Sequence, residues 1–232
     1  MQMLKEWEQG VFFSNKRPLK GKSMYKNLVI AGAGEFGREL YWTILDAKGY
    51  GHDFIIKGYV DSADPSTFTK LQVPLLGTPE NYEIQDDDVF TCAIGNPISR
   101  EKVVNCLLGR GARFINIIHK TSIIHGNVKY GTGLVICPFT SIGDSSEIGD
   151  YVVLNSYSAI GHDSVVGNYT CIMSHCDITG HTKIGKKVFV GGGAGTVPKA
   201  KIGDEAYVGA GSVVLRKVNP GVKVFGNPAV EI

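Results

Sequence analysis

The chain has 232 residues, enough for one large domain or two small ones, and its 24 Lys and Arg residues nearly balance 22 Asp and Glu residues. This mixed, near-neutral charge gives no reason to expect nucleic acid or a membrane surface as a partner. No apolar run approaches the roughly 20 residues that span a bilayer, and the first ten residues lack a secretory apolar core. We therefore expect a cytoplasmic protein.

The cysteines are scattered along the chain. They are Cys92, Cys106, Cys137, Cys171 and Cys176. Their odd number and the lack of a CxxC pair argue against a disulfide framework or a zinc site. We interpret them as small and mostly buried side chains.

Residues 1–25 form an extension in which basic residues and a proline break any hydrophobic period. An over-long start and a functional arm both remain open for it. Residues 26–116 then alternate apolar runs with helical segments. The expected order is a strand at 27–31, a helix at 38–47, strands at 54–60 and 89–94, a helix at 99–108 and a last strand at 113–117. This alternation predicts a parallel sheet of Rossmann type, at about half the size of a full dinucleotide fold.

A glycine turn follows the first predicted strand. The segment GAGEFG has the GxGxxG spacing between a strand and a helix, where free N–H groups at the helix start can bind a phosphate. Its residues are Gly32, Ala33, Gly34, Glu35, Phe36 and Gly37. Asp61 ends the second strand, where a carboxylate can accept hydrogen bonds from ribose hydroxyls. A mononucleotide or a nucleotide-linked sugar suits this small sheet, and a tight turn without a ligand is the alternative.

From residue 118 the chain repeats every six residues. Fifteen of the seventeen positions from Ile118 to Val214 in steps of six are aliphatic, a short or β-branched side chain often stands two residues earlier, and glycine often follows. A period of six is neither helical nor a simple alternation. It predicts a solenoid whose short strands form the sides of a triangular coil, with 18 residues per coil and roughly five coils. Corner glycines allow sharp turns or close approach of the backbone.

The repeat resembles the left-handed parallel β-helix of the hexapeptide acyltransferases, and the handedness rests on this resemblance alone. With the α/β unit in front, residues 26–232 resemble bacterial sugar acetyltransferases that include UDP-4-amino-sugar N-acetyltransferases and sialic acid O-acetyltransferases. The matching stretches are GAGEFG, Ala93–Asn96, Phe114–His119, Leu154–Ser156, Ile160–Asp163 and Phe225–Ala229. They are specific for the family and much less so for the substrate.

The resemblance implies a function for each region. Residues 26–116 would hold the nucleotide or sugar acceptor, 117–216 would form the acyltransferase β-helix, and 217–232 would form a cap and a tail that contacts coenzyme A. Acetyl-CoA would be the co-substrate and would lie between neighbouring subunits of a homotrimer. A solenoid face of small and apolar residues supports this assembly, because such a face is a poor exterior for a monomer.

His162 is the strongest catalytic candidate. It stands two places after inward Ile160, and so at a corner and facing outwards, where core packing does not explain an imidazole. By resemblance it is the general base, and a pKa near neutrality suits a group that takes a proton and returns it. Asp163 would raise its basicity and fix its tautomer. Asn155 would orient the acceptor.

Further site residues follow from the resemblance. The acetyl-CoA positions are Cys171, Gly180, Gly192, Ala210, Gly226 and Pro228, with Gly180 as the amide donor to the oxyanion. The acceptor positions are Gly32, Gly34, Glu35, Phe36, Gly37, Asp61, Gly95 and Asn96. In two places the chain departs from an amino-sugar subgroup that has histidines at these positions, with Phe36 in the glycine turn and Cys171 in the cofactor site. His175 could replace the second of these histidines.

Other functions have their own signatures. A β-helical carbonic anhydrase would bind zinc through three histidines, but His175 and His181 stand six residues apart, on corners that we expect to be well separated. We therefore expect no metal. A non-catalytic nucleotide-binding scaffold would bind a nucleotide without turnover. Acetyl transfer leads, to an amine of a nucleotide-linked amino-sugar in the first place, with O-acetylation of sialic acid or another sugar as the alternative.

Overall fold

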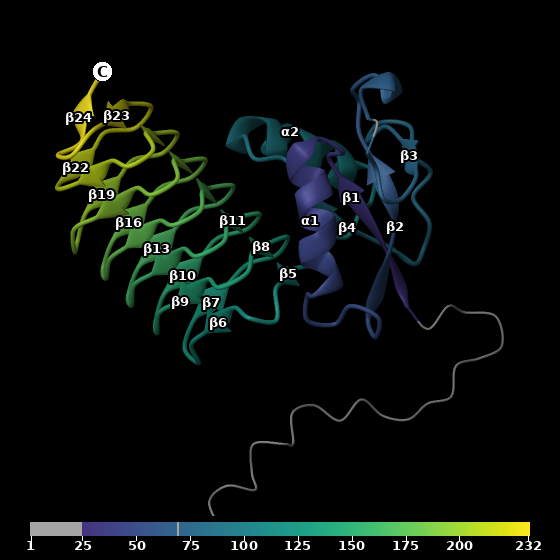
Figure 1. The fold of residues 1–232 in the computed structure, drawn as a ribbon, viewed down its shortest axis with the longest axis horizontal. Helices are drawn as coiled ribbons and strands as arrows, with labels where there is room; N and C mark the ends of the chain where they lie inside the picture. The colour runs from purple at the N-terminus through teal and green to yellow at the C-terminus, as the bar shows by residue number, and fades with distance from the viewer. Residues whose placement is uncertain (1–24, 69) are drawn as a thin grey trace, which may run out of the picture.

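The computed structural model describes residues 25–68 and 70–232. Apart from Tyr25, the extension expected at 1–25 lies outside the described residues. An α/β domain stands at one end and a long solenoid at the other (Figure 1). The predicted α/β domain followed by a parallel β-helix is thus confirmed.

The α/β domain is built on one parallel sheet in the order β3-β2-β1-β4. Its strands are β1 (Lys26–Ala31), β2 (Phe54–Val60), β3 (Leu75–Gly77) and β4 (Asp88–Cys92), and its helices are α1 (Glu35–Leu45) and α2 (Pro97–Gly109). Alternate residues of β1 enter two different cores, Leu28 and Ile30 on one side and Val29 and Ala31 on the other. The sheet is therefore covered on both faces, as a parallel sheet requires.

Two parts of this domain differ from the sequence prediction. The short strand β3, which follows Pro74, was not expected. The strand expected at 113–117 is wrong, because Phe114 makes only an isolated bridge to Phe90 of β4. The side chain of Asn116 then accepts from Leu134 N and donates to Gly131 O of the first coil, at 3.0 Å each. These bonds turn the chain out of the sheet and into the solenoid.

The solenoid consists of two-residue strands that pair in parallel with the strands 18 residues further on. The first coil holds β5 (Ile117–Ile118), β6 (Ile123–Ile124) and β7 (Lys129–Tyr130). The following strands are β8 (Val135–Ile136), β9 (Ser141–Ile142), β10 (Glu147–Ile148), β11 (Val153–Leu154), β12 (Ala159–Ile160), β13 (Val165–Val166), β14 (Cys171–Ile172), β15 (Asp177–Ile178), β16 (Lys183–Ile184), β17 (Phe189–Val190), β18 (Gly195–Thr196), β19 (Lys201–Ile202), β20 (Tyr207–Val208), β21 (Val213–Val214), β22 (Lys217–Val218), β23 (Lys223–Phe225) and β24 (Val230–Glu231). Two of the three sheets have six strands each, so the solenoid has six coils rather than the roughly five expected.

The inward positions stack as the repeat predicts. Leu154 pairs with Ile136 and with Ile172, and the row continues through Val190 to Val208. All five side chains are buried in one continuous core. Strands β22 and β23 follow the predicted end of the solenoid at residue 216 and still pair with its sheets.

The backbone conformation at the corners agrees only in part with the role that the sequence prediction gives to the glycines. A positive φ belongs mostly to non-glycine residues, such as Asp163 at 55° and His181 at 58°. The glycines just after the inward positions serve close approach instead. A Cβ on Gly161 would lie 2.4 Å from the backbone N of Gly180 in the next coil. Consecutive coils therefore touch through their backbones at this corner.

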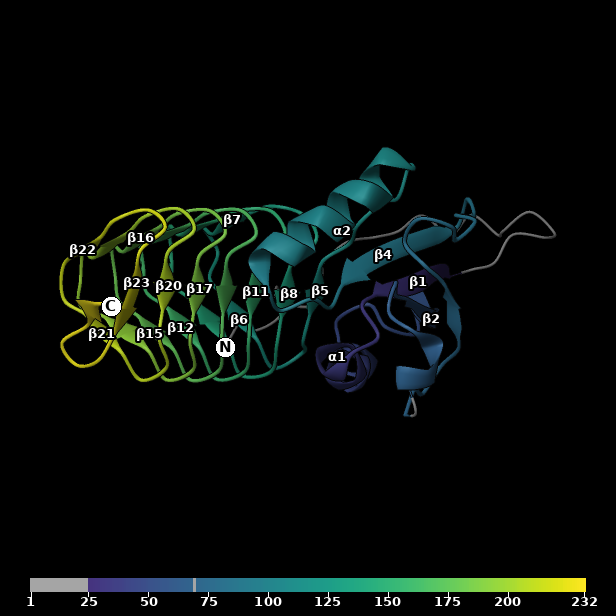
Figure 2. The same cartoon turned by 90° about the horizontal axis from the view of Figure 1, so that it is seen from above.

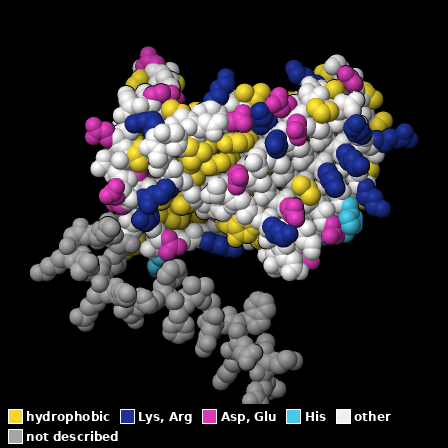
Figure 3. Space-filling view, turned by 180° about the vertical axis from the view of Figure 1, so that it is seen from behind, with side chains coloured by type: hydrophobic (Ala, Val, Ile, Leu, Met, Phe, Trp, Pro, Cys, Tyr) yellow, Lys and Arg dark blue, Asp and Glu magenta, His cyan; other side chains and the backbone are white. Residues whose placement is uncertain are grey.

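The three outer faces of the solenoid differ in character. The face of β8, β11 and β14 packs against the α/β domain through Val135, Val153 and Cys171, and α2 runs alongside it (Figure 2). On the second face, β9, β12 and β18 carry the small residues Ser141, Ala159 and Gly195 outwards, whereas β6, β15 and β21 carry Ile123, Asp177 and Val213. The face of β16, β19 and β22 carries exposed lysines, and Lys and Arg side chains gather on the solenoid in Figure 3.

A buried arginine joins the two domains. Arg100 of α2 donates to Ile94 O at 2.6 Å in its own domain and to the carbonyl oxygens of Tyr169 and Thr170 in the solenoid, the latter at 3.1 Å. In the part of the chain that the structure describes, no helix combines the length and the apolar character needed to cross a membrane.

Candidate active site

His162 projects from a solenoid corner, between β12 and β13, with 62% of its side chain exposed. Its Nδ1 lies 2.7 Å from Asp163 Oδ2. Because an ionised carboxylate only accepts hydrogen bonds, Nδ1 carries the proton and Nε2 keeps its lone pair. The predicted outward position of His162 and its contact with Asp163 are therefore present in one chain.

Gly180 lies beside the free edge of this imidazole. A Cβ on Gly180 would stand 2.8 Å from His162 Nε2, so only glycine leaves the ring its present place. The carbonyl of Gly180 accepts from Lys199 N at 3.1 Å, whereas its N–H makes no hydrogen bond to any described residue. The backbone thus presents an unpaired donor next to the imidazole.

A second histidine joins this corner, and sequence analysis missed it. The rings of His162 and His181 have centroids 5.0 Å apart and cross at 84°. His181 Nε2 is 3.9 Å from Asp163 Oδ2. Asp163 and His181 stand 18 residues apart, which is one coil, so a search at the coil length would have found the pair. The comparison of His181 with His175 alone, six residues away, did not reveal this pair.

Asn155 lies at a different corner of the coil. It is 7% exposed, and its Oδ1 accepts from Ser156 N at 2.8 Å. Strand β12 separates it from His162 within the same coil. One chain therefore does not bring Asn155 and His162 into a common site.

The corner of Asn155 carries a ladder of exposed rings. Phe139 stacks on Tyr157 and Tyr157 on His175, with centroids 5.0 Å apart in both pairs. The next two rungs are Gly193 and Gly211, where an added Cβ would meet nothing closer than 3.9 Å. The predicted cofactor positions Gly192 and Ala210 are the residues just before these glycines. Gly192 is half-buried and Ala210 is exposed. The ladder thus ends in an open strip of backbone.

Cys171 differs from its expected position. It is 1% exposed and packs in the core shared by the two domains. Burial raises the pKa of its thiol, and the guanidinium of Arg100 opposes this. This agrees with the interpretation of the cysteines as buried side chains. It leaves almost none of the Cys171 side chain exposed for the cofactor position that the resemblance implies, because the α/β domain covers this face of the solenoid.

The glycine turn of the α/β domain is closely packed. Gly32 has a φ of 108°, and a Cβ on Gly37 would lie 2.1 Å from Gly32 O. Asp61 Oδ2 accepts from Ala33 N at 2.7 Å and Oδ1 accepts from Ala63 N at 2.9 Å. The carboxylate expected to accept from a ribose thus already holds the turn in place.

A second predicted acceptor element also has an internal partner. Asn96 is the N-cap of α2, and its Oδ1 accepts from Ser99 N at 2.9 Å. The carbonyl of Gly95 accepts from Arg100 at 3.3 Å. Both residues therefore fix the start of α2.

The open part of the acceptor region lies at the start of α1. A cavity of about 320 Å³ is lined there by Gly34 and Glu35, as predicted, and also by Ala33, Arg38, Thr67 and Phe68. Phe36 lies outside the lining and packs into the core instead. Sequence analysis missed Arg38, although a cation one turn into a helix that starts at a glycine turn suits a phosphate.

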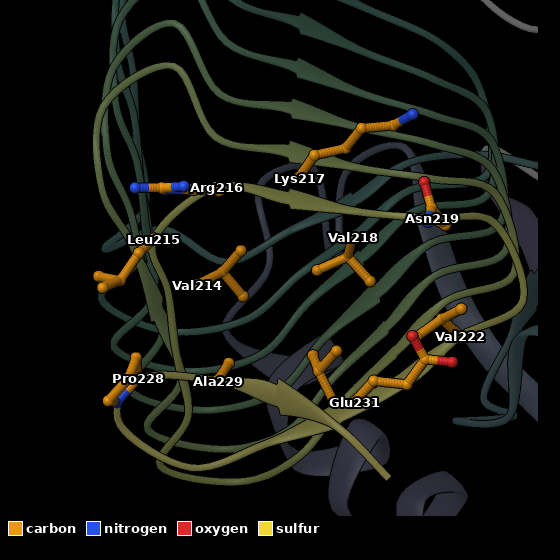
Figure 4. Close-up of a pocket in the computed structure, with 11 residues that line it drawn as sticks. Val214, Leu215, Arg216, Lys217, Val218, Asn219, Val222, Pro228, Ala229 and Glu231 are labelled. Carbon is orange, nitrogen blue, oxygen red and sulfur yellow. The ribbon is translucent and has the colours of Figure 1, made fainter.

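The predicted C-terminal turn borders another cavity, of about 390 Å³, at the end of the solenoid (Figure 4). Pro228 lines it and Gly226 precedes it. Val214 and Val218 are also in the lining, and Arg216 and Lys217 extend away from these valines. This cavity combines an apolar interior with cations at its edge.

The sequence matches known families in both domains. Residues 27–107 match the PglD N-terminal domain, and residues 181–216 match the bacterial transferase hexapeptide repeat. A GDP-perosamine N-acetyltransferase of Escherichia coli O157:H7 is 33% identical over 62 residues, which are 27% of this chain and 28% of that protein. The match therefore spans less than a third of this relative.

Solved structures match over almost the whole chain. PerB from Caulobacter crescentus, solved with CoA and GDP-perosamine, has a TM-score of 0.79 and 26% identity over 89% of this chain and 97% of that chain. WeeI from Acinetobacter baumannii has a TM-score of 0.80 and 27% identity over 88% and 99%. The acetyltransferase domain of PglB from Neisseria gonorrhoeae has a TM-score of 0.80 at 23% identity over 90% and 100%, which supports the fold alone. The chain thus matches the PglD N-terminal domain and the bacterial transferase hexapeptide repeat, and its fold is similar to that of these acetyltransferase structures.

Proposed function

We propose that this protein transfers the acetyl group of acetyl-CoA to the amine of a nucleotide-linked amino-sugar, with His162 as the general base. The observation that carries the proposal is the corner of His162. Asp163 holds Nδ1 at 2.7 Å, while Nε2 faces the backbone of Gly180, where a Cβ would intrude. An exposed imidazole in a fixed tautomer beside an unpaired N–H suits acyl transfer.

The proposed reaction is a direct transfer. The acceptor amine attacks the thioester carbonyl, and His162 Nε2 takes a proton from the amine as the new C–N bond forms. The Gly180 N–H stabilises the negative charge on the carbonyl oxygen. The C–S bond then breaks, and the imidazolium returns its proton to the departing thiolate. Asp163 stabilises the imidazolium between these two steps.

The cavity at the start of α1 is the proposed acceptor site. Free N–H groups at a helix start together with Arg38 favour a diphosphate. GDP-perosamine is bound in the similar PerB structure, which supports a nucleotide-linked amino-sugar as the substrate class. Asp61, which we expected to contact a ribose, would act instead by holding the glycine turn that lines this cavity, through its hydrogen bond from Ala33 N. Asn96 would act by fixing the start of α2.

The cofactor and the assembly are proposed together. Acetyl-CoA would extend along the open backbone strip at Gly192 and Ala210, with its tail near Pro228. Because Asn155 and His162 occupy different corners, we propose a homotrimer in which Asn155 of one subunit serves His162 of a neighbour. The small side chains on the face of β9, β12 and β18 allow close approach between subunits.

Two alternatives remain for comparison. The same base would serve a hydroxyl, so O-acetylation of sialic acid or another sugar is the alternative acceptor chemistry. A scaffold that binds nucleotides without turnover is the alternative of another class. The amine is favoured because the similar PerB was solved with GDP-perosamine, and because the relative from Escherichia coli is named a GDP-perosamine N-acetyltransferase.

The test is thiol release from acetyl-CoA with UDP-, GDP- and dTDP-linked amino-sugars, with free sialic acid and with hexoses. We expect turnover with a nucleotide-linked amino-sugar and an amide product that resists hydroxylamine. An ester product would establish O-acetylation instead. Nucleotide binding without turnover on any acceptor would favour the scaffold.

A further inference from the structure

We propose that His162, Asp163 and His181 form a binding site for a divalent transition metal such as Zn²⁺, and that the metal switches off the base. The three side chains each offer one ligand atom, and these atoms all lie within 4.8 Å of one another. Two imidazoles and one carboxylate are a ligand set that zinc commonly uses. Nothing in the acetyl transfer proposed above requires His181.

The distances between the three ligand atoms fit a bound metal ion after a small adjustment of the side chains. Ligand atoms around a tetrahedral zinc lie about 3.4 Å apart. The distance from His162 Nδ1 to Asp163 Oδ2 is 2.7 Å, and the distance from His181 Nε2 to the same oxygen is 3.9 Å. These values bracket the required separation. All three side chains are exposed, so rotation about their side-chain bonds can bring the ligand atoms to equal distances.

The backbone holds the three residues together. His181 N donates to His162 O at 2.9 Å, and Asp163 N donates to Asp144 O at 2.9 Å. Asp163 and His181 occupy equivalent rungs of successive coils, with the same positive φ. The metal would therefore bind to two stacked coils whose relative position is already fixed, and little ordering would oppose binding.

Metal binding and catalysis would exclude each other, a consequence that rests on the proposed function. An imidazole that coordinates through Nδ1 carries its proton on Nε2, the atom that faces Gly180. An imidazole that coordinates through Nε2 has no lone pair left there. In both cases His162 cannot accept a proton from the acceptor amine.

The direct test is calorimetric titration of the full chain with Zn²⁺ at neutral pH, on wild type, His181→Gln and His125→Gln. His125 is an exposed histidine of the same row of corners, outside the cluster. We expect one zinc ion per chain in wild type, binding weakened by about tenfold or more in His181→Gln, as the loss of one of three ligands implies, and no change in His125→Gln. Equal binding by wild type and His181→Gln, or no binding to wild type, would overturn the proposal.

Two further measurements identify the ligands and the consequence. Co²⁺ in place of Zn²⁺ should give visible bands without the near-ultraviolet band of a thiolate ligand, and a strong thiolate band would place the metal at a cysteine and overturn the site. Zinc should inhibit acetyl transfer by wild type, and His181→Gln should resist this inhibition, with each protein compared with its own metal-free rate. The calorimetry does not depend on acetyl transfer, so a failure of the proposed function leaves the metal site testable.

Discussion

The glycine turn of the α/β domain and the His162 corner of the solenoid each have a carboxylate in a motif that predicts function, but the two carboxylates have different hydrogen-bond partners. In the glycine turn, both oxygens of Asp61 accept from backbone N–H groups of the same domain. At the corner, Asp163 Oδ2 lies 2.7 Å from His162 Nδ1 and 3.9 Å from His181 Nε2, and one edge of the His162 imidazole remains open. The acceptor atoms of a polar residue beside a tight turn are thus occupied by backbone N–H groups of the turn. A polar residue that the repeat does not need for its fold keeps its side chain available for chemistry.

The most severe test of this difference is to fill the space beside the imidazole of His162. Gly180→Ala places a methyl group 2.8 Å from His162 Nε2. We expect kcat/KM to fall by about 10- to 100-fold, because a displacement of the base of about 1 Å has that effect, with an unchanged thermal unfolding midpoint. Gly126→Ala is the matched control, since the added Cβ at this earlier corner of the same row meets nothing within 4 Å. Equal activity of the two variants would remove Gly180 from the site.

A matched pair of carboxylate variants sharpens the comparison directly. In Asp163→Asn the exposed amide no longer stabilises the imidazolium or fixes its tautomer, so we expect kcat/KM to fall by about tenfold or more with a change in stability within about 0.5 kcal/mol. In Asp61→Asn one backbone N–H faces an amide donor, so we expect a loss of about 1–3 kcal/mol in the free energy of unfolding. Chemical denaturation and thiol-release kinetics measure both. The reverse assignment of the two effects would contradict the account.

Mixed assemblies test whether one site needs two chains. Asn155→Ala and His162→Ala chains, each of low activity alone, are co-expressed with different tags and purified through both. If Asn155 serves the neighbouring His162, each mixed trimer that passes both purifications has about one third of its interfaces with both native residues. We expect activity near that fraction. Activity no higher than that of the separate variants would place both residues in the same subunit's site.

Much of this contrast could be predicted from the sequence, but the details could not. The period of six predicts the strands and the stacking of Leu154 on Ile136, because most inward positions carry an aliphatic side chain. It also predicts that His162 faces outwards. His181 was missed because the histidines were compared at a spacing of six residues, and not at the spacing of 18 residues that separates neighbouring coils. The hydrogen bonds of Asp61 depend on the path of the turn, and the cover over Cys171 depends on how two domains dock. Neither feature can be predicted from a local sequence pattern.

Thiol reactivity provides the smallest expected effect and tests the closed cores of both regions. Burial raises the pKa of Cys92 in the α/β domain and of Cys137 in the solenoid to about 12, and that of Cys176 to about 11. Their reactive thiolates are therefore scarce at pH 8. We expect a disulfide reagent to modify only the half-buried Cys106 quickly, and the four buried cysteines only after unfolding. Rapid reaction of Cys171 would show that the domain interface opens.

The most direct test of the account is the kinetics of His162→Ala beside wild type, with acetyl-CoA and the nucleotide-linked amino-sugar that wild type accepts. The account predicts a loss of about 10²- to 10⁴-fold in kcat/KM, the usual contribution of a general base, with an unfolding curve that matches wild type. A folded His162→Ala variant with the activity of wild type would contradict it, because the account assigns the proton transfer to His162 Nε2, the ring atom that faces Gly180.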